Sequence, residues 1–599
     1  MRVVAIGILL FLAAVGQVRA DARVLPQGLG TTATQARSAI IRGVYPGSNA
    51  GSCCWIGPKA RLRLYPPAAA DEIVFEIFEP SYALKNGSMQ AVSASIDGGR
   101  PQHRCCYGLG NSKISFALPK GRTKRGVTID LTMRNTFVPA LIGKGKDNRH
   151  LSALLRNVTY VNTSTGESFA LKIAPTRNER LLMVVALAVA ALLAFFLTRI
   201  RPSYGVAALI AITPFSFAYP LEGTTITPPK VVLLAVFLAS VLGRRWLGGK
   251  TFYALAIAQG TLVLSMAISS LHAGVLTAAA RETLKGAEFI LALFTAYRLY
   301  RADPNERLVL RVVALTTMIV VLVAFAGLPL GFYQSREWHG VALARIAGPL
   351  GGPNQLAGYL GVATPVLLAS LLFSKRRFAK SKVLELLALS LAIAGALFTF
   401  SRGGLAALFL GCAMLAILRS RPAWRLPALA GYGMIFIALL SVTMIYAAGA
   451  LPQLQSLFGS PTSLNGGLGT RTLLWHEAYF LWQHHRWLGV GPGNFQLHAF
   501  LDTGVRTHAN SLFLNTLAEQ GVVGLICVLA VVFCSATAFA GIDAPLLSKA
   551  SLACAITLAF HQLVDTIWIY PKVGVSWWLI LAIGAAALDA HRNSMSRPL

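Results

Sequence analysis

Long apolar runs recur along the chain from Leu181 onward and constrain its fold more than any other feature. Residues are 55% hydrophobic and only 13% charged, a composition typical of polytopic membrane proteins. Several of the runs approach the roughly 20 residues that a helix needs to cross a bilayer. The pattern predicts helices at about 181–198, 203–220, 228–243, 251–271, 283–300, 308–329, 353–373, 383–400, 403–418, 427–448, 511–540, 548–569 and 574–590. The predicted fold of residues 179–599 is therefore all-α, with about 12–13 transmembrane helices.

The formal net charge is +31, and the distribution of the basic residues along the chain predicts the membrane topology. Most basic residues lie in alternate short loops, as the positive-inside rule requires of cytoplasmic loops, and not in the single soluble patch typical of nucleic-acid binding. Thirteen crossings that start outside place the C-terminus in the cytoplasm. The few basic residues left on the outer side are Arg281, Arg336, Arg345, Arg402, Arg471, Arg486, Arg506 and Lys572.

Residues 1–20 have the pattern of a signal peptide. Arg2 supplies the basic start, Val4 to Val15 the apolar core, and Val18-Arg19-Ala20 the small residues of a cleavage site. An uncleaved anchor helix is the alternative interpretation. Either one predicts export of the segment that follows.

The sequence pattern of residues 21–178 predicts a periplasmic β-sandwich. Alternating apolar and polar residues at 73–78, 90–96 and 127–131 are typical of strands, and Asn86-Gly87 and Asp97-Gly98 are turn signals. Several short strands separated by turns favour a sandwich or barrel.

Four cysteines lie in this exported segment, as Cys53-Cys54 and Cys105-Cys106. Three pairings are possible, and free thiols are the alternative. A bridge between the two pairs would close a loop of about 50 residues and contribute roughly 4 kcal/mol. No histidines accompany the pairs at zinc spacing, so no metal site is predicted. Cys412, Cys527, Cys534 and Cys554 lie in apolar helices, where packing is the expected role.

Three short motifs in the exported segment give it a resemblance to the jelly-roll, galactose-binding-like modules found beside bacterial carbohydrate enzymes. They are Cys54-Trp55-Ile56-Gly57, Val92 to Gly98, and Phe137-Val138-Pro139 followed by Asp147 to Leu151. Such modules either bind sugar or only pack, and the sequence leaves both roles open.

Residues 449–510 form the one long segment of the second half that is too polar for a membrane, and we expect a large periplasmic loop there. Arginines that remain on the outer side are candidates to bind phosphate, because guanidinium groups make paired, charge-assisted hydrogen bonds. His508 titrates near neutral pH and is a candidate to accept a proton from a hydroxyl. Headgroup anchoring and helix capping are the simpler roles for any one of these arginines, and Trp475 suits an interfacial aromatic belt.

The order of these motifs resembles the O-antigen ligase and polymerase superfamily of membrane glycosyltransferases. The resemblance covers roughly Tyr204 to Ala590, and residues 21–178 are an additional domain. The motifs are Arg345 with Gly348 and Pro353-Asn354, Ser401-Arg402-Gly403, Arg471 with Trp475, Gly489 to Gly493, and His508 and Asn510 with Leu517, Glu519 and Gly521.

The resemblance implies an inverting glycosyltransferase that needs neither metal nor cofactor. It implies transfer of a glycan from undecaprenyl pyrophosphate to an acceptor hydroxyl at the periplasmic face of the bacterial inner membrane. Arg345, Arg402 and Arg471 would then bind the diphosphate, His508 would act as the base, and Asn510 and Trp475 are possible site residues. The implied partners are the lipid-linked glycan, a glycan, lipid or protein acceptor, and membrane lipids.

One departure from the family pattern affects the choice of base. The family histidine usually stands directly before an asparagine, whereas Ala509 separates His508 from Asn510 here. Asn510 therefore competes with His508 for the histidine position. A loop would allow His508 to reach the site, but a helix would turn it away by about 200°.

Three alternatives to a ligase remain at this point. A polymerase of the same superfamily would extend the chain, and the sequence does not separate it from a ligase. A polysaccharide transporter or flippase is less favoured, because such proteins usually carry mid-membrane carboxylates. Glu385, Glu519 and Asp565 lie in apolar segments, mostly towards predicted helix ends, and the sequence has no P-loop. An inactive scaffold is the third alternative.

Overall fold

The structure is a computed structural model that separates into two compact units, approximately residues 18–181 and 182–599. The described residues are 40–45, 55–64, 70–79, 89–107, 110–119, 127–136, 152–164, 167–170, 177–215, 219–221, 224–242, 248–328, 333–338, 341–374, 380–447, 470–503, 507–541 and 543–595. The predicted signal peptide and the side chains of both cysteine pairs lie outside this description.

The first unit consists of antiparallel strands, as the alternating pattern predicts. The strands are β1 (Ile40–Tyr45), β2 (Trp55–Leu64), β3 (Glu72–Glu79), β4 (Gln90–Ile96), β5 (Gln102–Tyr107), β6 (Gly110–Ala117), β7 (Val127–Met133), β8 (Leu154–Asn162) and β9 (Glu167–Ala170). They form one group in the order β5-β4-β7-β2-β1 and another in the order β6-β3-β8-β9. A single residue pair, Trp55 with Leu154, joins the two groups.

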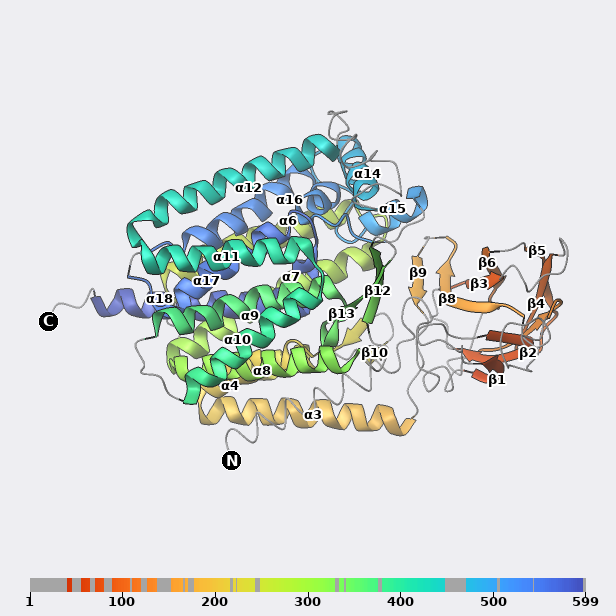
Figure 1. Ribbon diagram of the computed structural model, residues 1–599, viewed down its shortest axis with the longest axis horizontal. Coiled ribbons are helices and arrows are strands. Elements are labelled where there is room, and N and C mark those ends of the chain that lie inside the picture. Colours follow the sequence, from red (N-terminus) through yellow and green to blue (C-terminus); the bar gives the residue numbers. More distant parts are fainter. Residues whose placement is uncertain are drawn as a thin grey trace. The chain divides into compact units, whose positions relative to one another are not determined.

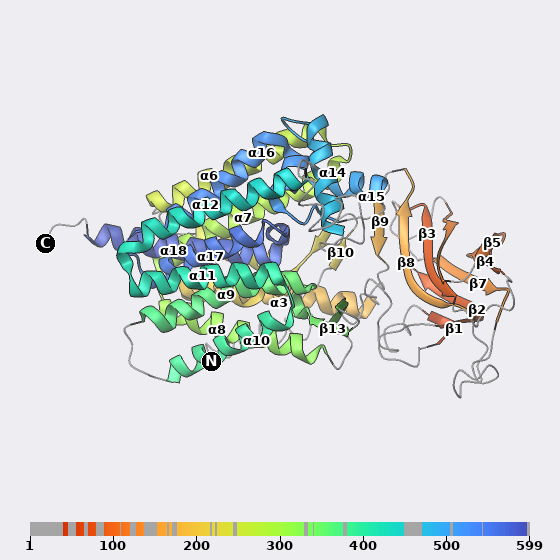
Figure 2. The same cartoon turned by 45° about the horizontal axis from the view of Figure 1, so that its top comes forward.

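Both strand groups contribute to one apolar core. Every second residue of β4 and of β7 is buried, and so are Ile73, Phe75 and Ile77 of β3. Figure 2 shows β3 and β8 together on one side of the unit and β4, β5 and β7 on the other. This arrangement confirms the predicted β-sandwich.

The second unit is helical, and each of the thirteen predicted helices has a counterpart. The counterparts are α3 (Arg177–Ile200), α4 (Pro202–Ile212), α5 (Pro228–Val241), α6 (Lys250–Ser269), α7 (Leu276–Ala302), α8 (Glu306–Ala326), α9 (Pro353–Phe373), α10 (Lys380–Phe398), α11 (Arg402–Ser420), α12 (Arg425–Ala447), α16 (Leu512–Thr537), α17 (Leu546–His561) and α18 (Pro571–Met595). Within the described residues, seven of them are long and apolar enough to cross a membrane: α6, α8, α9, α11, α12, α16 and α18. The protein is therefore a multi-pass membrane protein.

Three helix boundaries differ from the predicted ones by seven residues or more. Helix α4 ends at Ile212, where Pro214 follows and a short hairpin of β10 (Tyr219–Leu221) and β11 (Thr224–Ile226) begins. Helix α7 begins at Leu276, since residues 276–281 are mostly good helix formers. Helix α17 ends at His561, and residues 562–570 form a turn with a short 3₁₀ helix.

The described part of the polar segment between α12 and α16 contains two helices, α14 (Thr470–His484) and α15 (Phe495–Thr503). A glycine turn at residues 489–493 joins them, and Gly489, Gly491 and Gly493 all have positive φ. The turn pairs with a break in α16 at Gly521, where Val490 N donates to Ala518 O and Gly491 N donates to Glu519 O. The broken backbone of α16 is therefore satisfied by the turn, as a low-dielectric environment requires.

Close backbone approach explains why this turn needs glycine. A Cβ at Gly489 would lie 2.2 Å from the carbonyl carbon of Glu519, and Gly489 has a φ of 66°. We expect Gly489→Ala to lower the apparent unfolding temperature, because the strained φ alone costs about 1 kcal/mol and the backbone clash adds to it. Thermal unfolding in detergent measures this effect. Gly260→Ala is the matched control, since a Cβ there meets nothing within 4 Å. Equal unfolding temperatures for the two variants would contradict the expectation.

Candidate active site

The candidate residues gather at one end of the helical unit. Figure 1 shows α14, α15 and the hairpin of β12 (Tyr333–Trp338) and β13 (Val341–Ile346) at this end. The C-terminal end of α18 lies at the opposite end in the same view. Residues that are far apart in the sequence therefore meet where the polar segment between α12 and α16 lies.

Arg345, near the end of β13, bridges two helix ends. Its Nε donates to the carbonyl oxygen of Thr399 at 2.8 Å, and Nη2 donates to Oδ1 of Asn354 at 2.8 Å. Thr399 follows the last turn of α10, where free carbonyl groups attract a cation. Asn354 stands in the first turn of α9. The guanidinium is thus held in position but remains only half-buried.

Asp565 connects Arg345 to Arg471. Asn354 Nδ2 donates to Oδ2 of Asp565 at 2.5 Å, and Arg471 Nη2 lies 3.6 Å from the same oxygen. The Asp565 side chain is only 7% exposed, whereas that of Arg471 is 31% exposed. The buried carboxylate of Asp565 therefore contacts Arg471 directly and is linked to Arg345 through Asn354.

Arg402 is the first residue of α11, and its side chain is exposed. The next two residues, Gly403 and Gly404, pack against Val564 and His561. Arg402 therefore begins a helix whose start lies against the turn that carries Asp565. In the described part of the chain its guanidinium makes no hydrogen bond or ion pair, so it is accessible to a ligand.

His508 lies in the non-helical stretch before α16, so the rotation that a helix would impose does not apply to it. The amide nitrogen of Gln496 lies 2.8 Å from its Nε2 and 3.1 Å from its Nδ1, and the ring meets that of Tyr570 edge-on at 6.0 Å. The side chain of Asn515 accepts a hydrogen bond from Ala509 N at 3.1 Å, which fixes the adjacent backbone.

Burial lowers the pKa of the His508 imidazole to about 4, although nearby carboxylates act in the opposite direction. The ring is therefore neutral at physiological pH and able to accept a proton. An imidazolium in this position needs electrostatic support, because burial disfavours the charged form.

Asn510 and Trp475 contribute to the backbone geometry around His508. Asn510 has a φ of 52°, a left-handed conformation that asparagine tolerates better than most residues. The indole Nε1 of Trp475 donates to the carbonyl oxygen of Asn510 at 3.4 Å. Trp475 is buried in an apolar cluster with Leu474, Phe495 and other residues.

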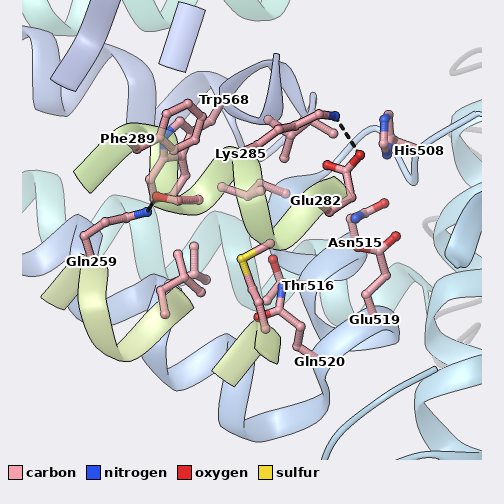
Figure 3. Close-up of a pocket in the computed structure, with 16 residues that line it drawn as sticks. Gln259, Glu282, Lys285, Phe289, His508, Asn515, Thr516, Glu519, Gln520 and Trp568 are labelled. Atoms are coloured by element: carbon pink, nitrogen blue, oxygen red, sulfur yellow. Dashed lines mark hydrogen bonds and ion pairs between the residues drawn. The ribbon is translucent and has the colours of Figure 1, made fainter. Parts of the chain in front are cut away.

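A small cavity lies beside His508, among α6, α7 and α16 (Figure 3). Its volume of about 60 Å³ suits a few water molecules and excludes a sugar ring. Polar residues on its wall include Gln259, Glu282, Lys285, Glu519 and Gln520. No sequence pattern indicated a role in the site for Gln259, Glu282, Lys285 or Gln520, and Glu519 stood out only within a family motif and as a carboxylate in an apolar segment.

Several other residues of the site were not predicted from sequence. Asp565, His561, Gln496 and Asn515 come from different elements and have no shared spacing that would reveal them. A cation-rich outer face without a compensating carboxylate was the one available signal for Asp565. The described residues contain no cluster of three or more histidine, cysteine or carboxylate side chains suited to a metal ion.

Residues 387–529 match the family model described as O-Antigen ligase. The match extends from α10 into α16 and includes Arg402, Arg471, His508 and Asn510, while Arg345 and Asp565 lie outside it. It confirms the resemblance to the O-antigen ligase superfamily. No curated protein matches the chain.

Asp565→Asn tests the shared carboxylate. The change keeps the shape of the side chain but removes the charge that Arg471 faces, and we expect the unfolding free energy to fall by about 2 kcal/mol. Thermal unfolding in detergent is the measurement. Asp543→Asn serves as control, because Asp543 is exposed. If Asp565→Asn unfolds at the wild-type temperature, the carboxylate does not organise the site.

The lowered pKa of His508 predicts a stability that depends on pH. An unfolded histidine binds a proton near pH 6.5, whereas folded His508 does so only near pH 4, so stability is lost as pH falls through this window. The loss approaches about 3 kcal/mol below pH 4. We expect His508→Gln to unfold at a temperature that changes less than that of the wild type between pH 6.5 and 4.5. If the unfolding temperatures of the two proteins changed equally with pH, the result would contradict a buried, neutral His508.

Proposed function

We propose that this membrane protein, whose residues 387–529 belong to the O-antigen ligase family, is an inverting glycosyltransferase for a lipid-linked glycan. Undecaprenyl pyrophosphate carries the glycan in this proposal, and the reaction takes place at the periplasmic face of the inner membrane. The family match supports ligase-type activity in general. The observation that supports the specific reaction is the chain of contacts from Arg345 through Asn354 and Asp565 to Arg471, close to a neutral histidine.

The three arginines would bind the diphosphate of the donor. Arg345 is oriented by Thr399 and Asn354, Arg471 is partly exposed beside Asp565, and Arg402 is exposed at the start of α11. Bidentate guanidinium contacts stabilise the negative charge that develops on the diphosphate as the bond to the sugar breaks. Because such a cation is already oriented, little reorganisation free energy is needed when the bond to the sugar breaks.

His508 would accept the proton of the acceptor hydroxyl. The hydroxyl oxygen attacks the anomeric carbon from the face opposite the diphosphate, a carbon–oxygen bond forms, and the bond to the phosphate oxygen breaks. Undecaprenyl pyrophosphate leaves with the electron pair, and a single displacement inverts the anomeric centre. General-base catalysis of this kind contributes about 10²–10⁴-fold. A polymerase would use the same steps with a growing glycan as the acceptor.

The N-terminal β-sandwich would bring the acceptor or the glycan to the membrane surface. This role rests on its predicted export and on its resemblance to carbohydrate-associated modules. Binding of the purified sandwich to polysaccharide is therefore a secondary part of the proposal.

Transfer in proteoliposomes tests the proposal directly. With undecaprenyl-pyrophosphate glycan and acceptor, we expect the wild type to release undecaprenyl pyrophosphate. Arg345→Ala, Arg402→Ala and Arg471→Ala should each lower kcat/KM by about 10²-fold, and His508→Ala should lower kcat by 10²–10⁴-fold. Arg486→Ala is the control, because Arg486 is an exposed arginine of the same polar segment.

Other outcomes would redirect the assignment. Loss of activity in Asn510→Ala but not in His508→Ala would exclude His508 as the base. Movement of the lipid-linked glycan across the bilayer without release of undecaprenyl pyrophosphate would favour a flippase. Either result requires variants that retain the wild-type elution profile and unfolding temperature.

A further inference from the structure

An ion pair on α7 faces the same cavity as His508. Lys285 Nζ lies 2.6 Å from Oε1 of Glu282, one helical turn earlier, and the side chains are 24% and 14% exposed. A partly desolvated pair of this length is held more firmly than a typical surface pair. Both residues lie outside the segment that matches the family model.

Figure 3 shows the Glu282 carboxylate between Lys285 and His508, at the polar end of the cavity. The cavity has room for a few waters, and the side-chain oxygen of Gln259 on its wall is buried without a hydrogen-bond partner in the described part of the chain. Ordered water usually satisfies such an atom. The cavity is therefore large and polar enough for water to reach the groups that line it.

The glycine turn fixes the position of Glu282. A Cβ at Gly493 would lie 2.9 Å from Cγ of Glu282, so the absence of a side chain there leaves space for the carboxylate. Gln496, which contacts His508, follows on α15 only three residues later. The same turn thus sets the distance of both Glu282 and Gln496 from the imidazole.

Charged and titratable groups face His508 from several elements. Glu282 and Lys285 come from α7, Asp565 from the turn after α17, Glu519 from α16, and Tyr570 from the start of α18. Asp565 is already engaged by Asn354 and Arg471, and Glu519 accepts a hydrogen bond from Phe495 N. Glu282 forms an ion pair with Lys285, which lines the same cavity.

We propose that Glu282 and Lys285 are positioning residues for His508: the Glu282 carboxylate stabilises the imidazolium formed when His508 takes the acceptor proton, and the Lys285 ammonium, paired with that carboxylate, limits this stabilisation. This role rests on the proposed function of His508 as the base. After transfer, the imidazolium returns its proton to water in the cavity, and neither Glu282 nor Lys285 changes its bonds.

Glu282 and Lys285 carry opposite charges, so an electrostatic role predicts that their removal shifts the pKa of His508 in opposite directions. A purely structural role would not produce this pattern. We expect Glu282→Gln to lower the pKa of His508 and Lys285→Met to raise it, each by about one unit. NMR titration of protein labelled at histidine Cε1 measures both, and His508→Gln identifies the signal. Arg281→Met is the matched control, because Arg281 is an exposed cation on the same helix, one turn before Lys285. Shifts in the same direction, or shifts no larger than the control, would overturn the proposal.

The transfer assay supplies a second readout. At pH 7 we expect Glu282→Gln to lower kcat by about tenfold with little change in KM, the factor that corresponds to one pKa unit. Glu282→Asp should retain more activity than Glu282→Gln, because it keeps the negative charge. An equal loss in both variants would indicate a packing role and contradict the proposal.

The two readouts separate failure of this inference from failure of the proposed function. Opposite pKa shifts without any transfer by the wild type would support the electrostatic link and refute the glycosyltransferase assignment. Normal transfer by Glu282→Gln would leave the glycosyltransferase assignment intact and refute the role of the pair. Lys285→Met and Glu282→Asp keep the test decisive if Glu282→Gln does not fold.

Discussion

The buried carboxylate of Asp565 is the interaction on which the candidate site depends. Arg345 and Arg471 come from segments on either side of α9 to α12, and each would carry an isolated positive charge at the edge of the membrane without a counter-ion. Asn354 links the Asp565 carboxylate to Arg345, because its side-chain nitrogen donates to Asp565 and its side-chain oxygen accepts from the guanidinium of Arg345. The buried carboxylate therefore links two arginines of the candidate site, Arg471 directly and Arg345 through an amide.

The glycine turn at residues 489–493 supports this arrangement from the opposite side. Its backbone N–H groups satisfy the carbonyl groups freed by the break in α16, and Asn494 anchors the turn to the start of α7 through a 2.9 Å hydrogen bond from Val275 N. Helices α7, α15 and α16 are thereby held together around His508. The histidine lies in a non-helical stretch, and side chains of the neighbouring helices α15 and α16 form hydrogen bonds with its ring and with the adjacent backbone.

The sequence predicted much of the fold and part of the site. The positive-inside rule left eight basic residues on the outer side, and the family resemblance singled out Arg345, Arg402 and Arg471 among them. Neither argument needs tertiary information. Asp565 escaped a site assignment because residues 548–569 are apolar enough to continue a helix on paper. The helix instead ends at His561, where the backbone carbonyl groups of Gln562 and Asp565 accept from Leu512 N, a contact that no local pattern contains.

The sequence alone predicted the thirteen helices, three of the nine described strands of the sandwich and the resemblance to the O-antigen ligase superfamily, because apolar length, alternation and motif order are local properties of the chain. Only the tertiary structure decided which polar residues meet. Glu282 reaches His508, and Asn354 reaches Asp565, through packing between elements that are distant in the sequence. Such pairs depend on helix rotation and on where each helix breaks, which are set by the packing of the whole unit and not by any one segment.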